Sequence, residues 1–181
     1  MTTWATSDLH WSHRNIIKFS PLTRSKYETV ENMDEQMILE WNEIVQPDDI
    51  VYFLGDFAFC NAEKATRIAN RLNGKIHFIA GNHDLKTLKH EPFRDRMESV
   101  QDYLEIDYAG VKICMMHYPL NSWNQEHRGA ISCHGHLHDS KSGLEEYRSF
   151  NVGFDYTGKL LTNMDDIISE SLTRKIKKHH D

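Results

Sequence analysis

Short apolar runs and amphipathic stretches alternate along the first half of the chain. Residues 50–54 read Ile-Val-Tyr-Phe-Leu, a continuous apolar run that is typical of a strand buried on both faces. Residues 3–7 and 76–80 are also predicted strands. Residues 29–45 and 61–72 carry apolar side chains at helical spacing. The order strand, helix, strand, helix, strand predicts parallel strands joined by right-handed crossovers.

The second half of the chain has a different pattern. Residues 104–108 alternate between apolar and polar side chains up to Ala109-Gly110, and residues 111–116 are again apolar. This pattern predicts an antiparallel hairpin. Two more short strands and a last helix are expected over residues 130–133, residues 149–152 and from Asp165 through Ile176. The chain therefore belongs to the α/β class.

Length and charge narrow the class of protein. The 181 residues suit one domain, residues 1–181, with a hydrophobic core of its own. The formal net charge of -6 gives no electrostatic basis for a stable complex with a long nucleic acid. Neither a signal peptide nor an apolar run long enough for a membrane span is visible, so we expect a cytoplasmic protein. Its three cysteines are expected to be reduced.

Polar clusters follow five of the predicted strands. Each cluster contains side chains that bind metal ions through oxygen or nitrogen. They are Asp8-x-His10, Gly55-Asp56, Gly81-Asn82-His83-Asp84, His117 and Gly135-His136-Leu137-His138. Strands that lie side by side bring such clusters to one edge of a sheet. Together the clusters hold enough ligands for two metal ions.

These five blocks, in this order, resemble the signature of the calcineurin-like metallophosphoesterase superfamily. The resemblance spans residues 8–138 and implies a four-layer α/β/β/α sandwich with two mixed sheets. It implies one metal ion on Asp8, His10, Asp56 and His138, and a second on Asp56, Asn82, His117 and His136. Asp56 then bridges the two ions. The two cations are expected to be Mn²⁺, Zn²⁺ or iron, because carboxylate, amide and imidazole ligands accept all of these.

The resemblance also implies the catalytic roles of two residues. His83 is expected beside the leaving-group oxygen, where it donates a proton or stabilises the developing charge. Asp84 is expected to orient the imidazole of His83. Four further cations and histidines are candidate substrate contacts, although a solvent-exposed role is the alternative for each. They are His13, Arg24, His127 and Arg128.

Two departures from the family pattern bear on the substrate. The protein phosphatases of the superfamily follow Gly-Asp with an Asp-Arg pair that holds phosphate, whereas this chain continues with Phe57 and Ala58. The strand-end His117 is followed by Tyr118-Pro119 instead of a glycine. In contrast, His13 and the segment 150–155 resemble small bacterial and phage members. These features favour a compact enzyme and argue against a protein phosphatase.

The sequence thus predicts a dinuclear-metal-dependent phosphoester hydrolase, with a phosphodiesterase acting on a small nucleotide-like substrate as the first choice. A phosphomonoesterase of small metabolites and a nuclease remain as alternatives. A non-catalytic, protein-binding scaffold of the same fold is disfavoured, because every ligand position and His83 are filled. The order of residues 134–139 also disagrees with the zinc motif of metallo-β-lactamase-like hydrolases.

Overall fold

Nine strands form two mixed sheets in the computed structural model, which describes residues 1–178. The last three residues of the predicted domain 1–181 lie outside the described residues. In spatial order, the first sheet consists of β4 (Ser99–Gln101), β3 (Lys75–Ile79), β2 (Ile50–Phe53), β1 (Thr3–Thr6) and β9 (Thr162–Asn163). The parallel pairing of β1, β2 and β3 confirms the prediction. The pattern did not predict β4, which pairs parallel with β3, or β9, which pairs antiparallel with β1.

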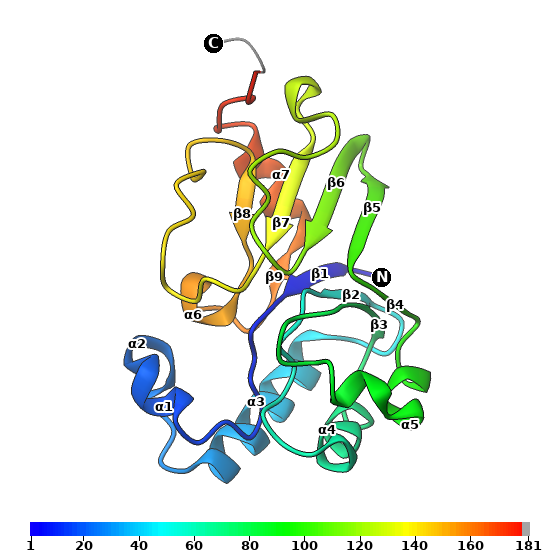
Figure 1. Cartoon of the computed structure of the whole chain (residues 1–181), viewed down its shortest axis with the longest axis vertical. Helices are drawn as coiled ribbons and strands as arrows, with labels where there is room; N and C mark the ends of the chain where they lie inside the picture. The colour runs from blue at the N-terminus through cyan, green and yellow to red at the C-terminus, as the bar shows by residue number, and fades with distance from the viewer. Residues whose placement is uncertain (179–181) are drawn as a thin grey trace.

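The second sheet lies above the first in Figure 1. Its spatial order is β5 (Tyr103–Tyr108), β6 (Val111–Met116), β7 (Ile131–His134) and β8 (Ser149–Asn151). β5 and β6 form the predicted antiparallel hairpin, whereas β6, β7 and β8 are parallel. Parallel pairing brings the ends of β6 and β7 to the same edge of the sheet.

The helices are short apart from one. They are α1 (Ile16–Phe19), α2 (Pro21–Arg24), α3 (Val30–Ile44), α4 (Ala62–Ala69), α5 (Glu91–Asp95), α6 (Phe154–Thr157) and α7 (Met164–Ser171), with 3-10 turns η1 (Thr87–Lys89) and η2 (Glu126–Arg128). The side chains of Thr29 and Asn61 cap α3 and α4 as predicted. None of the helices within residues 1–178 has the length and apolar character needed to cross a membrane.

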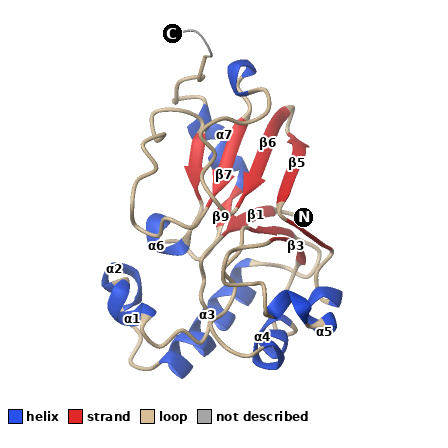
Figure 2. Ribbon diagram, viewed as in Figure 1, coloured by secondary structure: helices blue, strands red, loops and turns tan. Residues whose placement is uncertain are grey.

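One hydrophobic cluster lies between the first sheet and the helices α3, α4 and α5, which Figure 2 shows below that sheet. Aromatic rings fill much of it. The ring centroid of Phe53 lies 6.1 Å from that of Trp11 and 6.4 Å from that of Trp41. Trp11 is fully buried although it belongs to the loop after β1. This packing fixes the path of the loop that carries the first predicted metal ligands.

A second cluster fills the space between the two sheets. It contains inward-facing side chains of both sheets, such as Ala5 and Leu54 from the first and Ile113 and Cys133 from the second. The outer face of the second sheet is covered by the connection from β6 to β7, where Cys114 packs with Trp123 and Ala130. The predicted α/β sandwich with two mixed sheets is confirmed. Cys114 and Cys133 are free and buried, as expected of reduced thiols.

The last helix is shorter than the pattern predicted. The sequence predicts a helix running through Leu172 and Ile176, but α7 ends at Ser171, and Leu172 is 71% exposed. Beyond the helix, the backbone N–H of Lys175 donates to the carbonyl of Glu146 at 2.9 Å. The chain therefore leaves the helix to pair with a distant loop, which the helical spacing of the apolar residues does not reveal.

Candidate metal centre

All seven predicted metal ligands follow the end of a strand. Asp8 and His10 follow β1, Asp56 follows β2 and Asn82 follows β3 in the first sheet; the other three, His117, His136 and His138, follow β6 and β7 in the second. Because the strands within each set are parallel neighbours, their ends meet at one edge. The four ligands of the first sheet thus share one edge of that sheet, and the three ligands of the second sheet share one edge of theirs.

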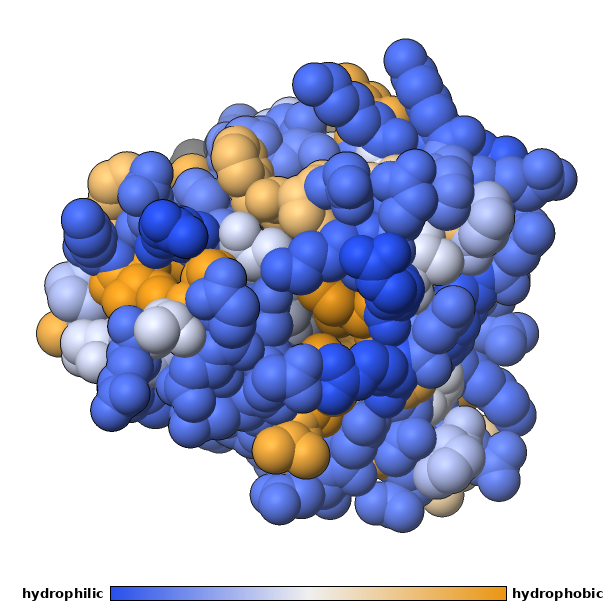
Figure 3. Space-filling model, turned by 90° about the horizontal axis from the view of Figure 1, so that it is seen from below, coloured by the Kyte–Doolittle hydropathy of each residue, from blue (hydrophilic) through white to orange (hydrophobic). Residues whose placement is uncertain are grey.

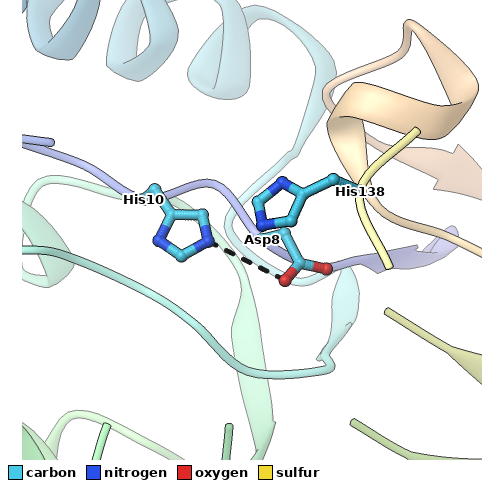
Figure 4. A group of neighbouring side chains, drawn as sticks. All are labelled: Asp8, His10 and His138. Atoms are coloured by element: carbon cyan, nitrogen blue, oxygen red, sulfur yellow. Dashed lines mark ion pairs between the residues drawn. The ribbon is translucent and has the colours of Figure 1, made fainter. Parts of the chain in front are cut away.

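Two groups of ligand atoms lie close together. One group consists of Asp8, His10 and His138, and the other of Asp8, Asp56 and His117, with the ligand atoms of each group within 4.8 Å of one another. Figure 4 shows the first group, in which the rings of His10 and His138 stack with their centroids 5.1 Å apart beside the Asp8 carboxylate. Asp8 belongs to both groups, so the groups adjoin.

The carboxylate of Asp56, which belongs to the second group, also lies close to His10 of the first. Its Oδ2 atom is 3.6 Å from Nε2 of His10 and 3.6 Å from Nε2 of His117. These distances are too long for hydrogen bonds. Asp56 is 2% exposed, so its carboxylate is shielded from solvent by protein.

Unpartnered polar atoms indicate that the centre suits a cation. Within residues 1–178, Oδ1 of Asp8 and both ring nitrogens of His10 are buried and have no hydrogen-bond partner. Such atoms are costly to bury unless a ligand satisfies them. Burial lowers the pKa of His10 well below its usual value, so its imidazole is neutral at pH 7. A neutral imidazole beside carboxylates is the form that binds divalent metal ions.

Hydrogen bonds hold two of the histidines in the orientation that a metal ligand needs. Nδ1 of His117 lies 2.7 Å from the carbonyl oxygen of Leu54, and Nδ1 of His138 lies 2.9 Å from Oδ2 of Asp155. Since a carbonyl oxygen can only accept, the Nδ1 of His117 carries the proton. Its Nε2 atom then offers a lone pair to the centre.

The remaining two predicted ligands lie beside the second group. Oδ1 of Asn82 is 3.0 Å from Nε2 of His117. The ring of His136 lies 5.1 Å from that of His117 and packs edge-on against Tyr118 at 4.6 Å. The backbone N–H of His136 donates to Oδ2 of Asp8 at 2.9 Å, which joins the last block of the sequence to the first.

The backbone at the centre adopts a conformation that side chains seldom tolerate. Eight described residues other than glycine have a positive φ angle, and five of them are predicted ligands: Asp8, His10, Asp56, His136 and His138. A residue held in a sparsely populated backbone conformation lowers the stability of the folded protein by about 1–3 kcal/mol. Backbone strain of this kind is concentrated at functional sites, so it agrees with the positions of the ligands.

The prediction that Asp84 orients His83 is wrong. Asp84 is fully buried, and its carboxylate accepts hydrogen bonds from the backbone N–H groups of Asp56, Phe57 and Gly81 at 2.7, 3.0 and 2.8 Å. It therefore fixes the loop after β2 against the loop after β3. The side chain of His83 is 45% exposed, and the backbone N–H of the same residue donates to Oδ1 of Asp56 at 3.0 Å.

The prediction that Arg24 contacts substrate is also wrong, because its guanidinium is fully buried. Nε and Nη2 donate to the carboxylate of Asp155 at 2.8 and 3.2 Å, while Nη1 and Nη2 donate to the carbonyls of Leu9 and Asp8 at 2.7 and 2.8 Å. Burial raises the pKa of Asp155, but the bonds from His138 and Arg24 outweigh it and hold that pKa far below its usual value. Arg24 thus secures both the loop after β1 and the partner of His138.

Asp155 was not among the predicted site residues. Its signal in the sequence is the segment 150–155, which resembles small members of the superfamily, but nothing in the segment shows that its carboxylate reaches His138.

His127 and Arg128 lie at the wrong end of the second sheet. They form part of η2, the turn that precedes β7, whereas His136 and His138 follow the other end of that strand. Four residues of strand separate the two ends by about 13 Å. Figure 1 shows this turn at the top of the molecule, away from the first sheet. Their prediction as substrate contacts is therefore wrong.

The remaining candidate, His13, lines a hollow beside the centre together with His10, His83 and His138. The volume of this hollow is about 460 Å³. His83 also lines a second hollow of about 470 Å³ with Asn82 and Lys86. His83 thus stands at the edge of the centre with space on both sides.

Residues 1–154 match the calcineurin-like phosphoesterase superfamily domain. The chain belongs to this superfamily. An uncharacterized protein of Methanocaldococcus jannaschii is 36% identical to it over 147 residues, which cover 80% of this chain and 73% of that protein. The Gene 66 protein of Mycobacterium phage L5 is 26% identical over 192 residues, which cover 88% of this phosphoesterase and 89% of the phage protein.

A solved structure has the same fold. The crystal structure of a protein of unknown function from Aquifex aeolicus matches the phosphoesterase with a TM-score of 0.71 and 21% identity, covering 93% of this chain and 98% of that one. This likeness shows the fold alone. Membership of the superfamily, with the groups of metal-binding side chains, makes the protein a metal-dependent phosphoester hydrolase.

Proposed function

We propose that this phosphoesterase uses two metal ions to hydrolyse small phosphodiesters of the nucleotide type. The proposal rests chiefly on Asp56, whose Oδ2 atom is equally distant, at 3.6 Å, from His10 in one ligand group and from His117 in the other. A carboxylate in this position is suited to hold two cations close together. When bound, two divalent ions clamp the attacking and leaving oxygens and lower the pKa of water.

The ligand set follows the resemblance. Asp8, His10, Asp56 and His138 form the first set, and Asp56, Asn82, His117 and His136 form the second. Manganese, iron and zinc all suit these donors. Asn82 completes the second set without adding another negative charge, which limits repulsion between this centre and an anionic substrate.

His83 is the proposed proton donor to the leaving oxygen. Its Nε2 atom lies 3.9 Å from Oδ2 of Asp56, and nearly half of its side chain is exposed to the hollows on either side. A substrate phosphorus at the centre would therefore lie next to this imidazole. A residue that donates a proton in the transition state contributes about 10²–10⁴-fold to the rate.

The charges around the centre favour a diester over a monoester. A phosphomonoester carries up to two negative charges and a diester one. Within residues 1–178, the hollow that contains His13 and His138 is lined by neither lysine nor arginine. The buried guanidinium of Arg24 has no nitrogen left for a phosphate. The site thus has no protein clamp for the second charge on this side.

A phosphomonoesterase is the second candidate, because Lys86 lines the other hollow beside Asn82 and His83. A nuclease is less well supported, since the formal charge of -6 opposes binding to a polyanion.

Parallel assays of bis(p-nitrophenyl) phosphate and p-nitrophenyl phosphate, with Mn²⁺, Zn²⁺ or Fe²⁺ added in turn, test the proposal. We expect the diester to give the larger kcat/KM. A larger kcat/KM for the monoester would favour the second candidate, and hydrolysis of neither with any metal would reject the proposed activity.

Two substitutions separate the assigned roles. Asp56→Asn is expected to lose at least one metal ion and all turnover, and His83→Ala to keep both ions and lose about 10²–10⁴-fold in rate. Metal content after gel filtration and initial rates provide the two measurements. Asp48→Asn is the matched control, because Asp48 is 88% exposed and precedes the start of β2, whereas Asp56 follows the other end of that strand. Full metal loading in Asp56→Asn would refute the bridging role.

A further inference from the structure

Aromatic side chains line the hollow beside the metal centre. Phe19 and Phe59 contribute their rings to it, together with the imidazoles of His13 and His83. We call this group of four side chains the aromatic cleft. Its volume of about 460 Å³ falls within the range of small-molecule binding pockets.

The rings of the aromatic cleft are arranged around His13. The centroid of His13 lies 4.4 Å from that of Phe59 and 6.2 Å from that of Phe19, and Phe59 lies 5.4 Å from His83. These separations are typical of interacting aromatic rings. His13 thus connects the α1 side of the cleft to the loop after β2.

Both phenylalanines keep much of their apolar surface in water. Phe19 is 68% exposed and Phe59 is 50% exposed, although the adjacent Trp11 and Phe57 are fully buried. A large apolar side chain that stays exposed forgoes the free energy that its burial would gain. Figure 3, a view from below, shows that hydrophobic side chains on that face form small separate patches among hydrophilic ones. Two exposed rings that face one hollow beside a metal centre therefore indicate a binding surface more strongly than a single exposed ring elsewhere would.

The lining of the cleft also limits the charge of what it binds. Among the described residues, its wall contains no lysine or arginine, and Asp139 is its one carboxylate. A second phosphate group would find no cation there. In contrast, the imidazoles of His13 and His83 in the wall can donate to or accept from a polar edge of a bound group.

We propose that the aromatic cleft binds a planar, uncharged aromatic group of the leaving alcohol, of the kind that a nucleobase supplies, stacked on Phe59. This inference rests on the proposed phosphodiesterase activity and adds the side of the substrate that the protein recognises. His83 forms part of the cleft, so the group bound there belongs to the oxygen that His83 protonates. In the reaction, water forms the new P–O bond and releases a proton to solvent, the P–O bond to this alcohol breaks, and the alcohol oxygen takes a proton from His83, which regains one from solvent.

The test compares two diesters with and without aromatic groups. Bis(p-nitrophenyl) phosphate has two aryl groups, and glycerophosphoglycerol has none. Because stacking contributes to binding of the substrate, Phe59→Ala is expected to raise KM for the aryl diester about tenfold and to leave KM for the glycerol diester within twofold. An equal change for both diesters, or no change for either, would overturn the proposal.

Conservative variants show whether stacking or apolar volume matters. Phe59→Tyr is expected to keep the wild-type KM for the aryl diester, whereas Phe59→Leu is expected to raise it. A wild-type KM in Phe59→Leu would overturn stacking as the mode of recognition. Leu22→Ala is the control, because Leu22 is 92% exposed in α2, close to Phe19 in sequence, and does not line the cleft.

A binding measurement separates this inference from the proposed activity. If the wild-type protein hydrolyses neither diester, the activity fails, but calorimetric titration of the metal-loaded protein with adenosine and with ribose still examines the cleft. Binding of adenosine that is at least tenfold tighter than that of ribose, and that is lost in Phe59→Ala, supports it. Equal binding of the two compounds would refute it.

Discussion

Arg24 shows how burial changes the role of a residue whose type alone suggests phosphate binding. An arginine in a polar stretch is a reasonable candidate for contact with an anion, yet here the side chain reaches inward to Asp155 and to the carbonyls of Asp8 and Leu9. The planar guanidinium can serve all three acceptors at once because its donors form a fixed fork. Its contribution is to position the ligand loops.

Arg24→Lys should therefore weaken the site without removing a charge. A lysine cannot reach all the acceptors, and each buried acceptor left unpaired costs about 1–3 kcal/mol. We expect a lower urea midpoint and weaker binding of metal by about 10–100-fold, as is usual when a residue that orients a ligand is lost. The control is Arg71→Lys, since Arg71 forms an exposed pair with Glu35, and such pairs contribute little. Equal effects of the two substitutions would contradict the assigned role.

His77 offers a pH prediction that does not involve the metal centre. Burial lowers the pKa of this β3 histidine, whose ring stacks on Tyr52. Below about pH 6.5 the unfolded chain therefore takes up a proton more readily than the folded protein, and stability falls as the pH decreases. We expect the free energy of unfolding, measured by urea titration with EDTA present, to fall less in His77→Gln than in the wild type when the pH is lowered from 7.5 to 5.5. An unchanged pH dependence would show that His77 contributes nothing to it.

At the scale of elements, the glycines of the strand-end motifs allow the loops to approach one another. A Cβ atom on Gly81 would lie 2.3 Å from Oδ1 of Asp56, and one on Gly135 would lie 2.3 Å from Oδ2 of Asp8. Each glycine thus leaves space for a carboxylate that belongs to a different motif. The sequence shows these glycines beside their own ligands but not the carboxylates they accommodate.

Gly81→Ala should consequently displace Asp56 without straining its own backbone. The added Cβ would also lie 2.5 Å from the backbone nitrogen of Asp56, so the loop after β2 must shift. We expect a large loss of metal affinity and turnover with a folded protein, measured by metal titration and circular dichroism. Gly110→Asn in the hairpin is the control, because no atom lies within 4 Å of a Cβ there and asparagine tolerates the positive φ. Normal metal binding by Gly81→Ala would contradict this account.

At the scale of the whole molecule, the predicted ligands come from both sheets. Asp8, His10, Asp56 and Asn82 follow strands of the first sheet, and His117, His136 and His138 follow strands of the second. Without a cation, the carboxylates and imidazoles across this junction rely on a few hydrogen bonds, such as that from the His136 backbone to Asp8. Metal ions at the junction would join the two sheets.

Metal loading should therefore raise the thermal stability of the entire protein. Ligand at about 100 times its Kd adds about 2.7 kcal/mol for one site. We expect Tm to rise when Mn²⁺ or Zn²⁺ is added to EDTA-treated protein, and the gain to shrink in Asp56→Asn. Differential scanning calorimetry over a range of metal concentrations provides the measurement. A Tm that is independent of metal would argue against a centre shared by the sheets.

The sequence by itself determined seven of the nine described strands, the hairpin, the helices α3 and α4 and the identity of the strand-end clusters, but not β4 or β9. These features depend on local periodicity and on residue type, which can be read without knowing the contacts. The order of the motifs matches that of the superfamily, and this resemblance predicted the sandwich of two mixed sheets. The prediction of a single domain over residues 1–181 stays a prediction.

Only the tertiary structure decided where particular side chains point. Asp84 and Arg24 turn inward to distant backbone groups, and His127 and Arg128 lie beyond the far end of β7. The carboxylate of Asp155 reaches His138, and Phe19 and Phe59 share one hollow. The physical reason is that these contacts join residues far apart in the chain, so they depend on the packing of whole elements and leave no periodic signal in the sequence.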